Sequence, residues 1–331
     1  MFKPLYDYLA IHPVVYVTRD RERAEGLPSE TEGYRIVSDQ NKSTRELMQS
    51  LEIKPGESVL VFKPNRQVEE VCRAHNWPLL NPSASLAEKV EGKVSQVAWL
   101  GPLASLLPEH WEGQVSDCRW ATPFVLQYNW GHSGEGTKLI KDEKDLGEII
   151  KQFPYRKVRV SKLINGDTFT NNNIVTSSGN VMTGNISYQI TGDSALTDNP
   201  FATVGNDWSL AETMLTEAEK GEYKKIVKKI GEKLASDGWK GLFGVDIIRE
   251  KSTGKMYLIE VNARQPASTT FESQLQNEQR RPGLREDQVF VFVGITTFEA
   301  HISALVGLDL SKEKLIEIKH GRRTINRREN N

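Results

Sequence analysis

Three oxygen-bearing side chains, Asp246, Glu260 and Asn262, are spaced so that a single fold-back of the chain would bring them together. Apolar residues alternate with others over 243–247 and again over 257–261, and a short turn ending in Gly lies between these stretches. This pattern predicts a β-hairpin with a three-residue loop. Glu260 and Asn262 then share one face of the hairpin, because side chains alternate along a strand.

Pairing Lys251 with Lys255 across the loop places Asp246 opposite Glu260. Two carboxylates that face each other across a sheet repel, so we expect a positive charge between them. Carboxylates and an amide oxygen form the all-oxygen ligand set that suits Mg²⁺, with Mn²⁺ as the alternative. The competing interpretation is a surface hairpin whose polar side chains face water. The metal site also depends on the assumed register, because a shift of one residue would turn Asp246 to the other face.

A Gly-rich segment follows a predicted strand over 124–128 and runs Gly131-His132-Ser133-Gly134-Glu135-Gly136-Thr137. The amides of such a segment can approach an anion closely, because glycine has no Cβ. Two hydroxyl side chains add further donors, whereas the single glutamate adds a negative charge. A hairpin loop that binds no ligand can have the same composition, so both interpretations stay open.

Composition limits the classes of partner. The chain has 331 residues, which suggests about two domains, and 38% of them are hydrophobic, as in a globular protein. The net charge of −1 gives no indication of a nucleic-acid or membrane partner. Two cysteines provide no disulfide framework or zinc signature, so we expect a cytoplasmic protein. The first residues contain no long apolar run, so we expect no signal peptide.

The first part of the chain alternates between predicted strands and helices. Strands are expected over 14–18, 34–38 and 58–62, with a further edge strand over 78–81. This alternation is typical of a small parallel α/β unit. The segment that follows, 84–121, is expected to be helical and amphipathic, with breaks at Gly101-Pro102 and at Pro108.

The second part contains polar strands. A strand over 157–162 ends in a turn, and Asn- and Thr-rich strands are expected over 168–176 and 181–190. Such strands either line a wet cleft or form an exposed sheet face. Thr216 and Glu219 form a capping box that predicts the start of a long helix.

The order of these parts resembles the ATP-grasp superfamily over roughly residues 10–310. The parts are the α/β unit, the Gly-rich loop, the strand ending Ser161-Lys162-Leu163-Ile164 and the hairpin with its Asp…Glu-x-Asn-x-Arg pattern. The resemblance implies a mixed α/β and α+β fold with ATP bound between its last two parts. These parts would be an N-terminal pre-ATP-grasp α/β domain (1–85), a small lid subdomain (86–165) and a C-terminal antiparallel-sheet subdomain (166–331).

The resemblance also implies roles for single residues. Asp246, Glu260 and Asn262 would bind the Mg²⁺ ions that bridge the ATP phosphates, and Arg264 would be the catalytic residue that stabilises the transferring phosphoryl group or the acyl-phosphate. The Gly-rich loop would close over the phosphates and a hinge would bind adenine. The residues expected to contact the nucleotide are Gln127, Gly131, His132, Ser133, Gly134, Gly136, Thr137, Lys162, Leu163, Ile164 and Asp167.

Two positions depart from the family pattern. Gln127 stands where a lysine usually contacts a nucleotide phosphate, and Lys138 or Lys141 would have to substitute for it. Ser161 stands where an acidic residue is common. These departures motivate an alternative function, that of a nucleotide-binding regulatory protein without turnover.

The reaction implied by the resemblance is an ATP-dependent, ADP-forming ligation. A carboxylate attacks the γ-phosphate, and an amine then displaces phosphate from the acyl-phosphate. The expected substrates are a small-molecule carboxylate, such as an amino acid or a peptide, and an amine, bound by loops over 193–209 and 265–285. A small-molecule kinase on the same fold is the other catalytic alternative, and a homodimer is the base-rate expectation.

Overall fold

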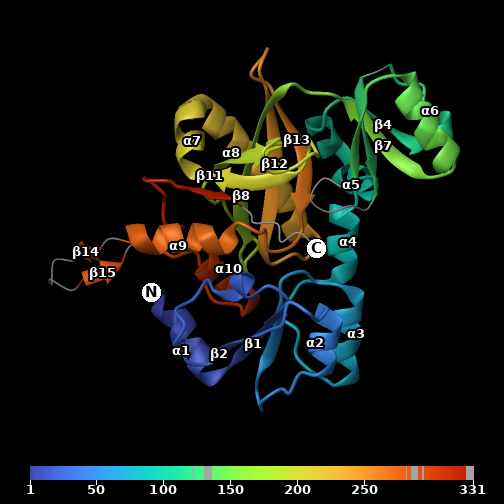
Figure 1. Cartoon of the computed structure of the whole chain (residues 1–331). Coiled ribbons are helices and arrows are strands. Elements are labelled where there is room, and N and C mark those ends of the chain that lie inside the picture. Colours follow the sequence, from blue (N-terminus) through green and yellow to red (C-terminus); the bar gives the residue numbers. More distant parts are fainter. Residues whose placement is uncertain (122, 130–135, 281, 285–289, 293, 326–331) are drawn as a thin grey trace.

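The computed structural model describes residues 1–121, 123–129, 136–280, 282–284, 290–292 and 294–325 (Figure 1). The described strands form a parallel sheet near the N-terminus, a small antiparallel sheet, a large mainly antiparallel sheet and a short hairpin. No helix in this part of the chain combines the length and the apolar composition that a membrane crossing requires.

The N-terminal sheet is parallel, as predicted, and its three strands have the order β2-β1-β3. Its strands are β1 (Val14–Thr18), β2 (Tyr34–Ser38) and β3 (Ser58–Val61), and its helices are α1 (Lys3–Ile11), η1 (Arg21–Ala24), α2 (Thr44–Gln49) and α3 (Arg66–Ala74). The edge strand predicted over 78–81 is wrong, because only a single bridge joins Leu79 to Val59. Beyond the bridge, the Asn81 side chain makes both hydrogen bonds to the backbone of Val61, so the main chain forms no ladder there.

The small sheet is antiparallel in the order β4-β7-β5-β6. Helices α4 (Ala84–Glu91), α5 (Ser95–Leu100) and η2 (Gly101–Leu106) precede it, and its elements are β4 (His110–Gln114), η3 (Val115–Asp117), β5 (Phe124–Tyr128), β6 (Thr137–Ile140), α6 (Glu143–Gln152) and β7 (Lys157–Lys162). The expectation of helix after the break at Pro108 is therefore wrong over β4. This short segment pairs along its whole length with β7, a partner distant in the sequence, and Trp111 packs against the core of the sheet.

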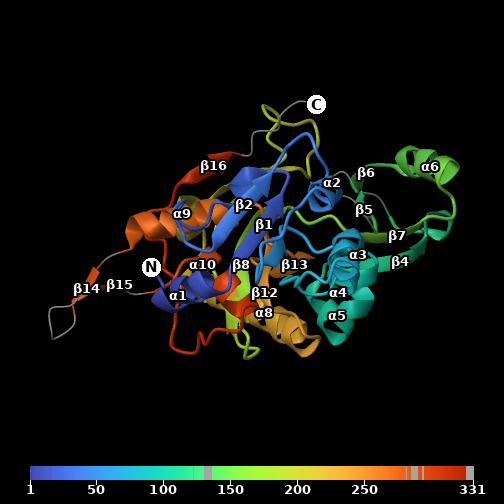
Figure 2. The ribbon, with the colours of Figure 1, turned by 90° about the horizontal axis from the view of Figure 1, so that it is seen from below.

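The large sheet has seven strands in the order β13-β12-β8-β10-β11-β16, with β9 beside β8. Its strands are β8 (Gly166–Val175), β9 (Val181–Met182), β10 (Ser187–Thr191), β11 (Thr203–Asp207), β12 (Gly241–Glu250), β13 (Met256–Asn262) and β16 (Arg323–Ile325). The remaining elements are α7 (Trp208–Met214), α8 (Glu217–Ser236), α9 (Thr269–Gln279), α10 (Thr297–Leu305) and the hairpin of β14 (Pro282–Leu284) and β15 (Phe290–Phe292). Seen from below, the N-terminal sheet lies in front of the large sheet (Figure 2).

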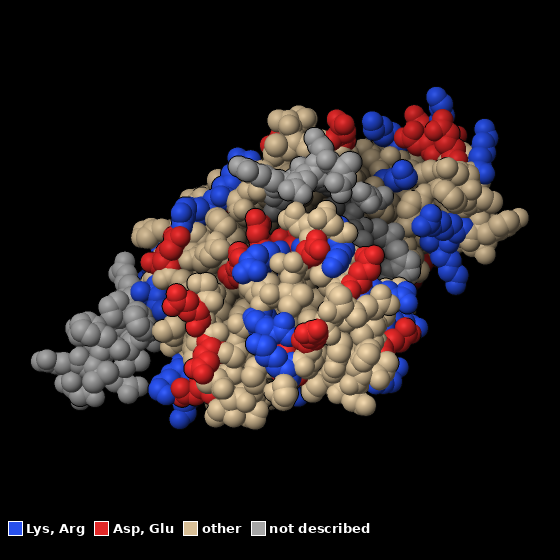
Figure 3. Space-filling model, turned by 60° about the horizontal axis from the view of Figure 1, so that its bottom comes forward, with Lys and Arg blue, Asp and Glu red and all other residues tan. Residues whose placement is uncertain are grey.

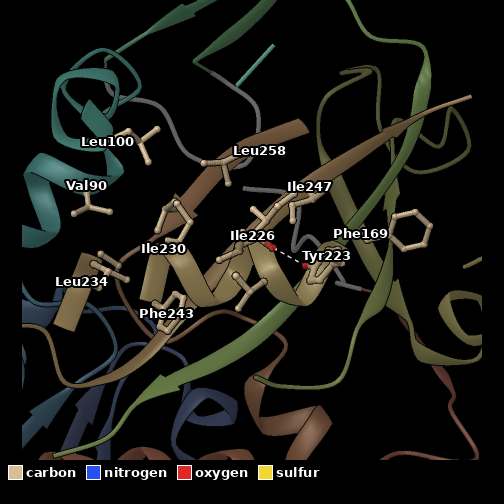
Figure 4. Packing of buried hydrophobic residues seen from close by; sticks show 14 of the residues in the cluster. Val90, Leu100, Phe169, Tyr223, Ile226, Ile230, Leu234, Phe243, Ile247 and Leu258 are labelled. Atoms are coloured by element: carbon tan, nitrogen blue, oxygen red, sulfur yellow. Dashed lines mark hydrogen bonds between the residues drawn. The ribbon is translucent and has the colours of Figure 1, made fainter. Parts of the chain in front are cut away.

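Helix α8, together with α4 and α5, shares an apolar core with one face of the large sheet (Figure 4). It begins at the predicted capping box of Thr216 and Glu219, and Ile226, Ile230 and Leu234 form its buried stripe. On the other side, α10 packs between the large sheet and the N-terminal sheet, with Phe298 in a cluster shared by both. The position of the N-terminal sheet is thus set by apolar packing of both sheets against α10.

The polar strand β8 divides its residues between two environments. Thr168 and Thr170 line a cavity, as one of the two interpretations predicts. Asn171 and Asn173 instead lie buried beneath α8, where their amides bond to each other and Asn171 Oδ1 lies 3.2 Å from the hydroxyl of Tyr223. Asparagine is tolerated in this core because each amide has a hydrogen-bond partner.

Candidate active site

The β12–β13 hairpin places Asp246 directly opposite Glu260, as the sequence predicts. The predicted loop is one residue too short, because Glu250 pairs with Lys255 and four residues form the turn. A register shift between Asp246 and Ile247 leaves Ile259 as an extra residue on β13, and this bulge restores the predicted pairing. Gly254 adopts φ +73° at the end of the turn, a conformation that glycine tolerates.

The acidic pair is held by side chains from three different segments. Asp246 Oδ1 accepts a hydrogen bond of 2.6 Å from Thr170 on β8, and its Oδ2 accepts one of 3.3 Å from Asn262 Nδ2. Glu260 forms an ion pair with Lys93, which lies between α4 and α5. Lys93 is therefore a charged residue of the site that was not predicted.

Burial, followed by the negative charge of Glu260, raises the pKa of Asp246 from 3.8 to about 6. The hydrogen bond from Thr170 and the charges of Lys93 and Arg264 act in the opposite direction. The net shift indicates that this end of the site has too little positive charge to keep both carboxylates ionised without cost. A divalent cation would remove that deficit.

Arg264 lies beyond the hairpin and is fixed by Glu91, the last residue of α4. Its Nη1 donates to Glu91 Oε1 at 2.6 Å, and Glu91 also pairs with Lys63, which follows β3 of the N-terminal sheet. Burial raises the pKa of Glu91, but the charges of Arg264 and Lys63 outweigh it and the net pKa is lowered. An ionised, buried carboxylate thus joins the N-terminal sheet to the predicted catalytic arginine.

The small sheet faces this hairpin with a row of polar side chains. Gln127 on β5 lies opposite Thr137 on β6 and opposite Arg159 on β7. Gln127 Oε1 accepts bonds from Arg159 Nε at 3.0 Å and Nη2 at 2.7 Å, and Arg159 Nη2 also donates to Ile259 O at 3.1 Å. The latter bond joins the small sheet to the bulge residue beside Glu260.

Between the two sheets lies a cavity of about 410 Å³. Its walls contain the predicted metal ligands and Arg264, the hinge residues Lys162, Leu163 and Ile164, and the predicted Gln127 and Thr137. Both segments expected to bind substrates also reach it, through Phe201 and Thr203 in one and Ala267 and Ser268 in the other. The structure thus brings together residues that are up to 175 positions apart, from Lys93 to Ser268.

Other predicted residues lie elsewhere. Gly131, His132, Ser133 and Gly134 fall outside the described residues. Gly136 lies at the start of β6, where its carbonyl accepts a bond from the Tyr128 amide. Asp167 does not line the cavity and instead forms an ion pair of 3.3 Å with Lys251.

The lysines considered as substitutes at Gln127 are not placed for that role. Lys138 and Lys141 are both exposed, and neither lines the cavity. The buried cation next to Gln127 is Arg159, which the sequence analysis missed. Its signal was a charged residue between two valines, Val158 and Val160, in a predicted strand, but its partner could be identified only from the β5–β7 register.

The donor set fits a hard divalent cation. Asp246, Glu260 and Asn262 all line the cavity, and they offer carboxylate and amide oxygens from one face of one hairpin. Among the described residues no group of three or more His, Cys, Asp or Glu side chains converges. A site with only two protein carboxylates suits Mg²⁺, which usually keeps water and phosphate oxygens as its other ligands.

Comparison with known proteins gives one curated relative and several solved structures of similar fold. The [butirosin acyl-carrier protein]–L-glutamate ligase of Niallia circulans is 23% identical over 168 residues, which are 51% of this chain. The chain spans only 39% of that relative's length.

The N5-carboxyaminoimidazole synthetase of Staphylococcus aureus, solved with ADP, has a TM-score of 0.66 at 13% identity, over 96% of this chain and 82% of its own. The biotin carboxylase domain dimer of the Hydrogenobacter thermophilus 2-oxoglutarate carboxylase, solved with MgADP, has a TM-score of 0.64 at 14% identity, over 91% and 71%. The L-amino acid ligase of Bacillus licheniformis has a TM-score of 0.62 at 16% identity, over 91% and 75%. At these identities the likeness establishes the fold alone.

The predicted fold class and family are thereby confirmed. Residues 91–268, more than half of the chain, match the ATP-grasp domain. This range begins at Glu91, just before Lys93, and ends at Ser268, just beyond Arg264, so it contains the hairpin and both walls of the cavity. The chain belongs to the ATP-grasp domain family.

Proposed function

We propose that the protein is an ATP-dependent, ADP-forming ligase. It joins the carboxylate of a small molecule, an amino acid or a peptide, to an amine through an acyl-phosphate. The observation that supports this most is the cavity, where a carboxylate pair and Arg264 lie on one side and the hinge Lys162–Ile164 on another. The Niallia circulans and Bacillus licheniformis proteins, both named as ligases, favour the same reaction class.

In the first proposed step, a carboxylate oxygen of the substrate attacks the γ-phosphorus of ATP. The bond to the β–γ bridging oxygen breaks, and ADP leaves with its electron pair. The amine nitrogen then attacks the acyl carbon, the bond to the phosphate oxygen breaks, and the nitrogen loses a proton to solvent. Arg264 lies in the cavity with its guanidinium fixed by Glu91, so it can stabilise negative charge without reorganising.

Asp246, Glu260 and Asn262 would hold Mg²⁺ in this proposal. The ion would neutralise charge on the β- and γ-phosphates. The protein's own contribution is to keep these side chains on one face of the hairpin, with Thr170 fixing the orientation of the Asp246 carboxylate.

Substrate access is proposed through the two segments that reach the cavity, near Phe201 and near Ser268. On the face shown in Figure 3, the coloured Lys and Arg side chains intermingle with Asp and Glu rather than forming an extended patch of one sign. This surface favours small-molecule substrates over a nucleic-acid partner.

The proposal is tested by measuring ADP and free phosphate with Mg²⁺, ATP and pooled carboxylates and amines. A ligase releases both products only when a carboxylate and an amine are present together. ADP without free phosphate would instead identify a small-molecule kinase. Nucleotide binding without ADP formation in any pool would favour the regulatory alternative.

The proposed organisation keeps the divisions 1–85, 86–165 and 166–331. In support, the strands β1–β3, β4–β7 and β8–β13 each fall within one of these parts. We also propose a homodimer, which light scattering would test, and a reducing cytoplasmic location, which suits Cys72 and Cys118 as buried free thiols.

A further inference from the structure

Arg159 is a buried cation that differs from its neighbours in the cavity. Only 3% of it is exposed, yet it lines the cavity wall. Lys93, which is also buried, and Arg264, which is partly exposed, each form an ion pair with a carboxylate. Arg159 forms no ion pair with any carboxylate among the described residues, although the charges of Glu260 and Glu112 act on it from a distance.

The hydrogen bonds of Arg159 all go to neutral acceptors. They are Gln127 Oε1, Ile259 O and, at 3.5 Å, Gln96 Oε1. These bonds leave one N–H of Nη1 without an acceptor among the described residues. A charge removed from water without a counter-ion is costly, and the cost falls sharply when an anion binds beside it.

A purely structural role is the alternative, since the bond to Ile259 O joins the small sheet to the hairpin. That bond needs only a neutral donor, so it does not account for a full positive charge. The two hydrogen bonds that Gln127 Oε1 accepts from Arg159 also have an effect. They fix the plane of the guanidinium beside the cavity, which is the preorganisation that recognition of an oxyanion requires.

We propose that Arg159 is an anion-binding residue that contacts a phosphate group of the bound nucleotide, with Gln127 as the residue that positions it. The anion is identified as a nucleotide phosphate on the basis of the proposed function. The cation on this wall thus comes from β7, one strand away from Gln127 on β5. Ile259 O holds the guanidinium on the side facing Glu260, where phosphate and metal would meet.

The experiment is calorimetric titration of the full-length protein with MgADP, and with adenosine as a ligand that lacks phosphate. Arg159→Met is expected to weaken MgADP binding about 10- to 100-fold, the usual value of a hydrogen-bonded charge pair, and to leave adenosine binding unchanged. The double variant Gln127→Lys/Arg159→Gln returns a cation to the wall from β5. It is expected to recover most of the lost MgADP affinity.

Arg156→Met is the matched control, because Arg156 is exposed in the same small sheet and stacks on Tyr128 instead of lining the cavity. It should leave both affinities unchanged. Equal MgADP affinity in Arg159→Met and wild type overturns the anion site. If Arg159→Met loses affinity for adenosine as well as for MgADP, the role of Arg159 is structural and the proposal is also overturned. If Arg159→Met does not fold, the double variant decides: a folded double variant that binds adenosine but not MgADP overturns the proposal. A wild-type protein that binds no MgADP contradicts the proposed function itself.

Discussion

The two walls of the cavity are electrostatically incomplete in opposite senses. The hairpin wall carries two facing carboxylates, of which Asp246 is held only by neutral donors. The small-sheet wall carries the buried guanidinium of Arg159, which is held only by neutral acceptors. A metal–nucleotide complex offers a cation to one wall and phosphate oxygens to the other, so a single ligand would satisfy both.

The walls also differ in what lies behind them. Behind the hairpin, α8 and the large sheet enclose an extensive apolar core that includes Trp239 and Phe243. Behind the small sheet, a much smaller cluster around Phe124 and Leu126 joins the strands to α6. Because local stability follows buried apolar contact, we expect the hairpin wall to be the rigid platform and the small sheet to open more readily.

Removing charge from the hairpin wall should have the largest effect. Glu260→Ala is expected to lower kcat/KM for ATP-dependent ligation about 10³-fold or more, because metal-based charge stabilisation contributes several kcal/mol to such transition states. Steady-state phosphate release measures this. Glu148→Ala, an exposed position on α6, is the control and should match wild type. Undiminished turnover in Glu260→Ala would show that this wall binds no catalytic metal.

Arg264 provides the next test, because it is the paired cation of the hairpin wall. Arg264→Ala is expected to lower kcat by about 10²- to 10³-fold with a small change in KM for ATP, as for the loss of one oxyanion donor. Glu91→Gln keeps Arg264 but removes its charged partner, so a smaller loss in kcat is expected. If KM for ATP rises and kcat is unchanged in Arg264→Ala, the residue binds ground state and transition state alike.

The contrast between the walls also explains what the sequence could reveal. The hairpin ligands lie within one local motif, so alternation and an assumed pairing across the loop placed Asp246 opposite Glu260. That success involved two errors that cancelled, since the loop is longer by one residue and the Ile259 bulge compensates. A bulge leaves no recognisable pattern in this stretch of alternating residues.

The small-sheet wall could not be predicted in the same way. Gln127 and Arg159 are 32 residues apart, and only the β5–β7 register shows that they meet. Lys93 lies in a segment expected to be helical, where a lysine indicates only a solvated face.

A third test concerns the polar support of the hairpin wall. Glu272 on α9 is fully buried, accepts bonds from Asn185 and Asn172, and connects through Asn172 to Ser268 in the cavity wall. Burial raises the pKa of Glu272 from 4.5 to about 7, against the effect of these hydrogen bonds. Between pH 4.5 and about pH 7, the Glu272 carboxyl keeps its proton in the native state and releases it in the unfolded state. The free energy of unfolding therefore falls as the pH rises through this window.

Glu272→Gln removes that titration. We expect the free energy of unfolding of wild type to decline by up to about 3 kcal/mol more than that of the variant between pH 4.5 and pH 7. Urea denaturation at a series of pH values measures the difference. Parallel curves for the two proteins would mean that Glu272 stays ionised in the native state. The Asp309→Asn variant at an exposed site is the control, since its low pKa lies outside this window.

The smallest expected effect concerns the packing behind the hairpin wall. Tyr223 Oη donates to Val245 O at 3.0 Å, directly beneath the strand that carries Asp246 (Figure 4). Tyr223→Phe should therefore lower the free energy of unfolding by about 1 kcal/mol, the net value of one buried hydrogen bond, while kcat and KM stay unchanged. Tyr257→Phe, on a partly exposed ring of β13, should change stability by less than about 0.5 kcal/mol. A loss of activity in Tyr223→Phe without loss of stability would mean that the hairpin wall is less rigid than its apolar core suggests. The two walls of the cavity would then differ in charge and not in rigidity.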